Sequence, residues 1–286
     1  PDKPSGRGQK INQSDVKKYA VANNLNVLQP TNLKDEAFIN QLKELNADLF
    51  VVVAFRMLPE VVWSMPDKGT INLHASLLPN YRGAAPINWA IINGEKETGV
   101  TTFFIEKEID TGKVIEQSKL AIGENESVGE LYERLMILGA DVMLSTVNSI
   151  AKSNVDSIDQ SEMMEARFKP APKIFKNDCI IDFSNSVTQV HNFCRGLSPY
   201  PAAWCTLYNK DKEEIKTYKI FNTEKTEIDS SNKTELDSCP DGILFPCADK
   251  YLLVKEIQSE GKRRMSFKDF MAGNPVKNLT IQAKKD

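Results

Sequence analysis

Hydrophobic and polar positions in the first half of the chain follow the periods of helices and buried strands. A helix over 33–45 is predicted by apolar residues at helical spacing, namely Leu33, Ala37, Phe38, Leu42 and Leu45. A continuous, β-branched apolar run over 49–55 predicts a buried strand, and further strands are expected at 70–74 and 100–105. Continuous apolar strands that alternate with helices are typical of a parallel sheet covered on both faces. The pattern therefore predicts an α/β architecture.

The second half of the chain changes character after one long helix. Ser127 and Glu130 form a capping box, and apolar residues continue the helix to Val142. Residues 152–177 are rich in Lys, Ser, Asp and Pro and are interpreted as a surface linker. Short strands are then expected at 179–183, 203–208, 215–221, 241–246 and 251–257, which is typical of a small antiparallel sandwich or barrel. We expect domains at 1–151 and 178–286, joined by a linker at 152–177.

Composition excludes several classes of protein. With 286 residues, of which 41% are hydrophobic, the chain has enough apolar mass for a core, and disorder is excluded. No apolar run approaches the ~20 residues of a membrane helix, so we expect no membrane span. The five cysteines are odd in number and lack the spacing of a zinc or redox site. We expect no disulfide framework, no metal and a cytoplasmic location.

Charge is unevenly distributed along the chain. Residues 1–18 carry a net charge of +3 and residues 260–286 carry +4, so the remainder carries −10. Residues 2–10 are dense in Pro, Gly and charge, which predicts an exposed loop bearing Lys3, Arg7 and Lys10. Basic ends around an acidic body favour a polyanionic partner that touches both ends, because phosphate neutralisation gives affinity independent of sequence. The alternative is that these lysines and arginines are simply solvated.

Candidate chemistry lies at the end of the 70–74 strand. The strand period of two places Asn72 and His74 on one face, where a buried parallel strand normally carries apolar residues. Ligands of open α/β sheets bind at the carboxyl ends of strands. A second loop, after the 100–105 strand, brings Asp110 to the same edge. The alternative is that His74 is a structural hydrogen-bonding residue and that Asn72 and Asp110 form turns.

These residues carry a resemblance to a known family. The segment from Asn72 to Pro79, followed by Arg82-Gly83 and by Asp110-Thr111-Gly112, resembles the signature of enzymes that transfer formyl groups from 10-formyltetrahydrofolate. Nearly the whole chain is similar to the methionyl-tRNA formyltransferase family. The resemblance implies a Rossmann-like first domain with a parallel sheet, an OB-like β-barrel as second domain, and methionyl initiator tRNA and the folate donor as partners.

The chemistry of formyl transfer suggests a role for each polar residue. Negative charge develops on the formyl oxygen when an amine attacks, and Asn72 and His74 offer donors to stabilise it. Asp110 would orient His74 and help move a proton from the amine to the departing folate nitrogen. The resemblance assigns the same three residues to catalysis.

The resemblance also implies the binding residues. The folate donor would contact Ser76, Leu77, Leu78 and Pro79, together with the backbone of Phe55, Arg56, Met57 and Leu58. Leu77 and Leu78 are equally explained as core residues. The tRNA would contact Lys3, Arg7 and Lys10 from the opening loop and Arg263 and Arg264 from the second domain, where a solvated turn is the alternative.

One departure from the family and two rival functions remain at this stage. Family members carry a strand, a helix and a strand ahead of the opening loop, so we expect the first strand of the sheet to be missing here and the natural protein to be longer. One rival is a formyltransferase that acts on a small amine, either glycinamide ribonucleotide or an amino sugar nucleotide. The other is a non-catalytic RNA-binding module. We expect a monomer.

Overall fold

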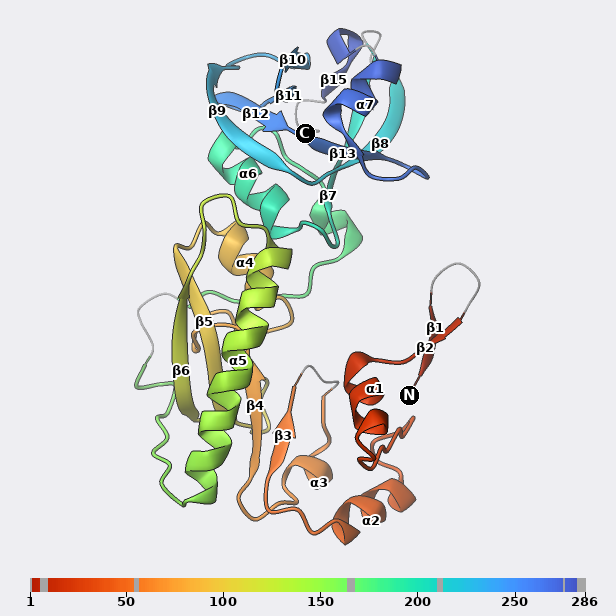
Figure 1. The fold of residues 1–286 in the computed structure, drawn as a ribbon. Coiled ribbons are helices and arrows are strands. Elements are labelled where there is room, and N and C mark those ends of the chain that lie inside the picture. The colour runs from red at the N-terminus through yellow and green to blue at the C-terminus, as the bar shows by residue number, and fades with distance from the viewer. Residues whose placement is uncertain are drawn as a thin grey trace. The chain divides into compact units, whose positions relative to one another are not determined.

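The chain folds into two compact units, Pro1–Asn72 and Leu73–Asp286, in the computed structural model of Figure 1. The structure describes residues 2–5, 10–53, 57–163, 168–209, 213–274 and 276–281. The boundary between the units falls inside strand β4, Thr70–His74, whose bounds agree with the predicted strand.

The first unit combines short strands with three helices. Its elements are β1 (Lys3–Ser5), β2 (Lys10–Asn12), α1 (Asp15–Ala22), α2 (Glu36–Glu44), β3 (Phe50–Val52), α3 (Glu60–Trp63) and the start of β4. The predicted helix over 33–45 is confirmed as α2, which begins where the Asp35 carboxylate accepts from the Phe38 backbone N–H at 3.0 Å. Strand β3 pairs with β4 in parallel, with Phe50 opposite Thr70.

Two expectations for this unit are wrong. Residues 3–5 and 10–12 form an antiparallel hairpin rather than a loop, because backbone pairing, with Lys3 opposite Asn12, needs no apolar side chains. Strand β3 was expected to be buried, but Val51 and Val53 are exposed. Among the described residues β3 has β4 as its one strand neighbour, so its outer edge lacks a partner to cover these side chains.

The second unit begins with the layer that carries the candidate chemistry. After the end of β4 come α4 (Pro86–Ile92), β5 (Glu97–Phe104), β6 (Val114–Ala121) and α5 (Val128–Ala151). Strand β5 confirms the predicted strand near 100–105, but its pairing with β6 is antiparallel. The expectation of a parallel sheet holds for β3 and β4 and is wrong for β6. Strand β6 was missed because four polar or charged residues, Glu116 to Lys119, interrupt its apolar pattern. Val100, Leu131 and Leu135 lie in the core between α5 and this layer.

Helix α5 begins at the predicted capping box. Ser127 Oγ accepts from the Glu130 backbone N–H, and the Glu130 carboxylate accepts from the Ser127 backbone N–H. With 24 residues, α5 is the one described helix long and apolar enough to cross a membrane by length and composition. The core helix of a globular domain passes the same test, and one face of α5 packs on β5 and β6. The helix is therefore weak evidence for a membrane span.

The chain then builds two antiparallel sheets around helix α6 (Val187–Gly196), as the strand spacing predicted. One sheet has the order β10-β11-β12-β9 and the other β14-β13-β8-β7-β15. Their strands are β7 (Ala203–Tyr208), β8 (Glu214–Ile220), β9 (Thr223–Asp229), β10 (Asp237–Cys239), β11 (Gly242–Pro246), β12 (Lys250–Val254), β13 (Glu256–Ser259), β14 (Met265–Ser266) and β15 (Thr280–Ile281). Helix α7 (Phe267–Gly273) and the 3-10 turns η1 (Lys176–Cys179) and η2 (Val276–Asn278) complete this part. The predicted strand at 179–183 is wrong: Ile180 makes only an isolated bridge to Trp204.

The connecting segment, residues 152–177, is more than a surface linker. Ile158 pairs with Val114 and Ala171 pairs with Gly83, both as isolated bridges. Gln160 and Ala171 are buried, so the expectation that this segment lies on the surface is wrong at these positions. Their polar groups find partners in the loop after β4 and in the loop between β5 and β6, which the local sequence pattern does not reveal.

Candidate functional site

His74 ends strand β4 and is fixed by a backbone carbonyl. Its side chain lies inside the second unit, and the residue is 7% exposed. Nε2 lies 2.8 Å from the Tyr81 carbonyl oxygen. A carbonyl oxygen accepts but cannot donate, so Nε2 carries a proton in this arrangement. The loop after β4 therefore sets both the orientation of the ring and the protonation of one nitrogen.

Asp110 faces the other ring nitrogen. Its Oδ2 lies 3.7 Å from His74 Nδ1, and its side chain is 9% exposed. The same oxygen accepts from the Gly83 backbone N–H at 2.9 Å, and the backbone of Asp110 has φ of +57°. The structure thus brings together two residues 36 positions apart that the sequence placed at one edge. A protonated His74 would form an ion pair with this carboxylate.

Asn72 is the last residue of the first unit. Its side chain is buried, and Nδ2 donates to the Val52 carbonyl at 2.9 Å, which ties the end of β4 to β3. The amide has a second N–H to offer. A single residue, Leu73, separates Asn72 from His74, and strand alternation gives their side chains the same face of β4.

The loop after β4 is held by hydrogen bonds within the second unit. Ser76 Oγ donates to the Asn80 carbonyl at 2.8 Å, and Thr101 Oγ1 donates to the Ser76 carbonyl at 2.6 Å and accepts from the Leu78 N–H. Leu78 is buried against Phe103 and Val114, and Pro79 is also buried. Leu77 is half-buried, and a side chain at Gly99 would collide with it.

The remaining predicted folate contacts lie in the first unit or outside the description. Met57 is exposed and Leu58 is half-buried. Phe55 and Arg56 lie outside the described residues.

Tyr81 anchors the loop that touches His74. Its hydroxyl donates to Glu95 Oε1 at 2.5 Å, and Lys169 pairs with the same carboxylate. Burial, together with the hydrogen bond to Glu95, raises the pKa of Tyr81, so the phenol stays protonated and donates. Burial alone would raise the pKa of Glu95, but the bonds from Lys169 and Tyr81 outweigh it and the pKa is lowered. The Tyr81 carbonyl is thereby held against His74.

Two glycines permit close backbone approaches at this site. Gly83 has φ of +124°, and a Cβ there would lie 2.4 Å from the Ala171 carbonyl oxygen. A Cβ on Gly112 would lie 1.7 Å from the Phe104 carbonyl oxygen. Only glycine fits such positions. Glycine is therefore required at both places, in the loop whose Gly83 N–H donates to Asp110 and in the loop that carries Asp110.

The predicted RNA contacts are only partly described. Arg263 and Arg264 are exposed; Arg264 pairs with Glu256, and its guanidinium lies 4.3 Å from the centre of the Phe221 ring. Lys3 and Lys10 lie in β1 and β2, and their side chains are outside the description. Arg7 lies outside the described residues.

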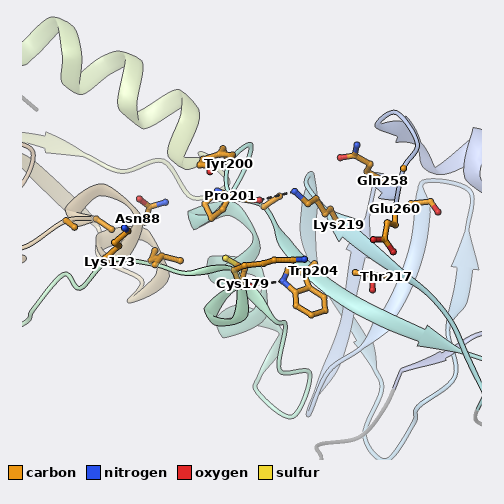
Figure 2. Close-up of a pocket in the computed structure, with 17 residues that line it drawn as sticks. Asn88, Lys173, Cys179, Tyr200, Pro201, Trp204, Thr217, Lys219, Gln258 and Glu260 are labelled. Carbon is orange, nitrogen blue, oxygen red and sulfur yellow. Dashed lines mark hydrogen bonds between the residues drawn. The ribbon is translucent and has the colours of Figure 1, made fainter. Parts of the chain in front are cut away.

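A groove of about 590 Å³ lies in the second unit between the α4 region, the connecting segment and strands β7, β8 and β13 (Figure 2). Its charged lining residues are Lys173, Lys176, Lys219 and Glu260, which gives a net charge of +2. Trp204 Nε1 donates to the Lys176 carbonyl at 2.9 Å, and Lys219 Nζ donates to the Pro201 carbonyl at 3.3 Å. Sequence reasoning missed these lysines, because Lys173 and Lys176 fall in the predicted linker and Lys219 falls in a strand. The basic run from Lys169 to Lys176 was the available signal.

A metal centre was not expected, and the described part of the chain offers no candidate for one. No group of three or more His, Cys, Asp or Glu side chains converges among these residues.

Comparison with known proteins finds a family match for each half of the chain. Residues 1–147 match the formyl transferase family model, and residues 173–275 match the model of the formyl transferase C-terminal domain. Methionyl-tRNA formyltransferase from Bacteroides thetaiotaomicron is 50% identical over 277 residues, which cover 96% of this chain and 85% of that protein.

Solved structures show the same fold at low identity. An N-formyltransferase from Helicobacter canadensis, in complex with folinic acid and dTDP-3-aminofucose, is 19% identical with a TM-score of 0.58; the match covers 90% of this chain and 85% of that one. HypX from Aquifex aeolicus, in complex with tetrahydrofolic acid, is 16% identical with a TM-score of 0.60; the match covers 82% of this chain and 40% of that one. The two family models span most of the sequence and half of the residues are shared with curated relatives, so the chain belongs to the formyl transferase family, in the group of the methionyl-tRNA formyltransferases.

Proposed function

We propose that the protein transfers the formyl group of 10-formyltetrahydrofolate to the α-amino group of methionine on initiator tRNA. The observation that carries this proposal is the buried His74–Asp110 pair at the end of β4, in a chain half identical to proteins named methionyl-tRNA formyltransferase. The family supplies the reaction class, and the pair supplies groups able to handle the charge and the protons of the transfer.

The proposed chemistry exchanges one carbon–nitrogen bond for another. The methionyl nitrogen forms a bond to the formyl carbon, the bond from that carbon to the folate nitrogen breaks, and a proton passes from the amine to the folate nitrogen. Asn72 donates its second amide N–H to the formyl oxygen while that oxygen carries negative charge. His74 donates from Nε2, with the formyl oxygen taking the place of the Tyr81 carbonyl as acceptor.

Asp110 acts on the opposite side of the imidazole. Its carboxylate lies 3.7 Å from His74 Nδ1 and would pair with a ring that is protonated at both nitrogens. Asp110 also assists the proton transfer, directly or through a water molecule. The Gly83 N–H fixes the carboxylate oxygen that faces the ring.

The folate donor supplies an activated formyl group, and this chain would hold it with the loop after β4. We propose contacts from Ser76, Leu77, Leu78 and Pro79, and from residues 55–58 of the first unit. The Ser76 hydroxyl donates to the Asn80 carbonyl, so Ser76 also shapes the loop that makes these contacts. Leu78 is a core residue that fixes the floor of the loop.

The tRNA would lie along the basic side of the second unit. Phosphate contacts position RNA without reading its sequence, and lysine and arginine supply them. We propose that Lys173, Lys176 and Lys219 of the groove in Figure 2 contact the acceptor arm, together with Arg263 and Arg264 and with Lys3, Arg7 and Lys10. Trp204, which borders the same groove, offers an aromatic face for an unpaired base.

A formyl-transfer assay with the donor folate and charged tRNAs tests this function. We expect rapid transfer to methionyl initiator tRNA and slow transfer to methionyl elongator tRNA. If the protein formylates glycinamide ribonucleotide or an amino sugar nucleotide and not the tRNA, the proposed substrate is wrong. Tight binding of tRNA without any transfer would identify an RNA-binding module.

We also propose that the protein acts as a monomer in the cytoplasm. The proposed substrates, a charged tRNA and a reduced folate, belong to the compartment of translation, and all five cysteines are unpaired thiols. Sedimentation of the purified chain at micromolar concentration tests the oligomeric state. A dimer mass would contradict it.

A further inference from the structure

Gln160, in the connecting segment, lies at the point where the two loops around His74 meet. The residue is 1% exposed, although its neighbours Asp159 and Ser161 are exposed. Burying an amide costs free energy unless its hydrogen-bonding groups are satisfied. The hydrogen bonds of Gln160 therefore show what its burial achieves.

All four hydrogen-bonding positions of the Gln160 amide are used. Oε1 accepts from Arg82 Nε at 3.0 Å and from Arg82 Nη2 at 2.6 Å. Nε2 donates to the Asp110 carbonyl at 2.9 Å and to the Gly112 carbonyl at 2.7 Å. Arginine can only donate and carbonyls can only accept, so the partners fix the orientation of the amide. No other side chain of this length offers two acceptor sites and two donors in this geometry.

The contacts join the two loops that hold the catalytic pair. Arg82 directly follows Tyr81, whose carbonyl accepts from His74, and directly precedes Gly83, whose N–H donates to Asp110. The Asp110 peptide has a positive φ, and its carbonyl is one of the two that Gln160 holds. The 3.7 Å separation of His74 and Asp110 therefore depends on a side chain that contacts neither carboxylate nor imidazole.

We propose that Gln160 is a positioning residue for the His74–Asp110 pair, which it sets by clamping the Arg82 loop to the Asp110 loop. This inference rests on the proposed function of the pair. The connecting segment thereby becomes part of the catalytic frame: without Gln160 the loops that follow β4 and β5 keep the bond from Gly83 to Asp110 but lose the four bonds of the clamp.

Two variants remove the clamp in different ways. Gln160→Glu keeps an oxygen for Arg82 but has no N–H for the two carbonyls, and Gln160→Met keeps the size and loses all four bonds. Trp89→Phe is the control, because it removes the bond from Trp89 Nε1 to the Pro172 carbonyl, a tether of the same segment that contacts neither Arg82 nor the Asp110 loop.

We expect kcat for formyl transfer to fall about tenfold to hundredfold in both Gln160 variants, because small misplacements of reacting groups have effects of that size. KM for folate and for tRNA should change little, and Trp89→Phe should keep the wild-type kcat. Circular dichroism checks the fold, and if Gln160→Met unfolds, Gln160→Glu carries the test.

A second readout needs no substrate. His74 and His191 are the two histidines of the chain, so nitrogen-15 spectra of the imidazoles of the full chain resolve both. We expect the His74 signals to shift in the Gln160 variants while those of His191 stay in place. A wild-type kcat in Gln160→Glu, or His74 signals unmoved in both variants, would overturn the inference. If the wild-type chain transfers no formyl group to methionyl initiator tRNA, the proposed function fails, and the spectra still decide whether Gln160 sets His74.

Discussion

The chemistry at the residue scale depends on giving each nitrogen of one imidazole a different partner. Nε2 of His74 faces a carbonyl that can only accept, and Nδ1 faces a carboxylate. Backbone groups contact both members of the pair: the Tyr81 carbonyl lies against His74, and the Gly83 N–H donates to the Asp110 carboxylate. A carboxylate that is already fixed beside the ring needs no reorganisation when positive charge develops on the imidazole.

Gly83 is expected to be the residue least tolerant of a methyl group in this loop. In Gly83→Ala the new Cβ would lie 2.4 Å from a backbone oxygen, at φ of +124°. Strain and overlap together should lower the free energy of unfolding by more than about 3 kcal/mol. Urea denaturation measures the change.

Gly261→Ala is the matched control for that substitution. Gly261 also has a positive φ, of +71°, but nothing lies within 4 Å of its would-be Cβ. The left-handed conformation alone should cost about 1 kcal/mol. Equal losses in the two variants would show that the contact with Ala171 is not what requires glycine.

At the scale of elements, helix α6 fixes the antiparallel part of the second unit to the loop before α5. Arg195 Nη1 donates to the Gly123 and Glu126 carbonyls at 3.1 and 2.9 Å. His191, one turn earlier and 1% exposed, bonds Thr223 of β9 through Nδ1 at 2.9 Å. From α4, Asn88 Nδ2 donates to the Gly196 carbonyl at the end of α6. One helix therefore connects several elements through buried polar groups.

Burial of α6 predicts an acid-dependent loss of stability. Burial, with the nearby Arg195 charge, lowers the pKa of His191 from 6.5 to about 4. The unfolded chain binds a proton at this residue below pH 6.5 and the folded chain does not, so stability falls as the pH falls from 6.5 towards 4. The wild type should lose about 3 kcal/mol more than His191→Asn over that range.

Urea unfolding at several pH values measures this difference. Thr223→Val provides the control, since it removes the bond to Nδ1 but keeps the titrating ring, and it should retain the acid-dependent loss. If the wild type and His191→Asn lose stability in parallel, the buried imidazole is not its source.

The elements that could be predicted from sequence are those whose signal is local. The Ser127–Glu130 box and the Thr70–His74 strand need only neighbouring residues, and both are confirmed. Strand β9 (TEKTEID) is polar or charged at most positions, and β6 carries four polar residues in a row, Glu116 to Lys119. Both were missed, because cross-strand partners stabilise them. The candidate site divides in the same way. The sequence motifs of the two loops pointed to His74 and Asp110. Gln160 could not be recognised from the sequence, because its partners lie 48 to 78 positions away.

At the scale of the whole molecule, the distribution of charge matters for a polyanionic substrate. The chain is net negative, with a charge of −3, yet the groove of the second unit is lined by three lysines and one glutamate. A local positive groove attracts phosphate even in an acidic protein, because screening confines the effect of distant charges to about 8–10 Å at physiological salt. Binding of tRNA should therefore be governed by this region and by the basic ends.

Neutralising the groove is expected to weaken binding of tRNA without changing its sequence preference. Each of Lys173→Gln, Lys176→Gln and Lys219→Gln should reduce the slope of log Kd against log salt by about one, if each lysine contacts one phosphate. Fluorescence anisotropy with labelled tRNA over a range of salt gives the slopes.

Lys119→Gln is the comparison for the groove lysines. This exposed lysine of β6 pairs with Glu97 at 2.7 Å and is not among the groove residues. It should leave the slope unchanged. If all three groove variants bind tRNA with the wild-type slope of log Kd against log salt, the groove does not contact the tRNA.

The central claim is that the His74–Asp110 pair performs formyl transfer to methionyl initiator tRNA. The most direct measurement is the single-turnover rate constant of that transfer, at saturating donor folate, for Asp110→Asn against the wild type. Asp141→Asn makes the same change of charge at an exposed carboxylate of α5 and serves as the control. We expect a loss of about 10²–10³ in the rate constant for Asp110→Asn and none for Asp141→Asn. A wild-type rate constant in Asp110→Asn would contradict the account.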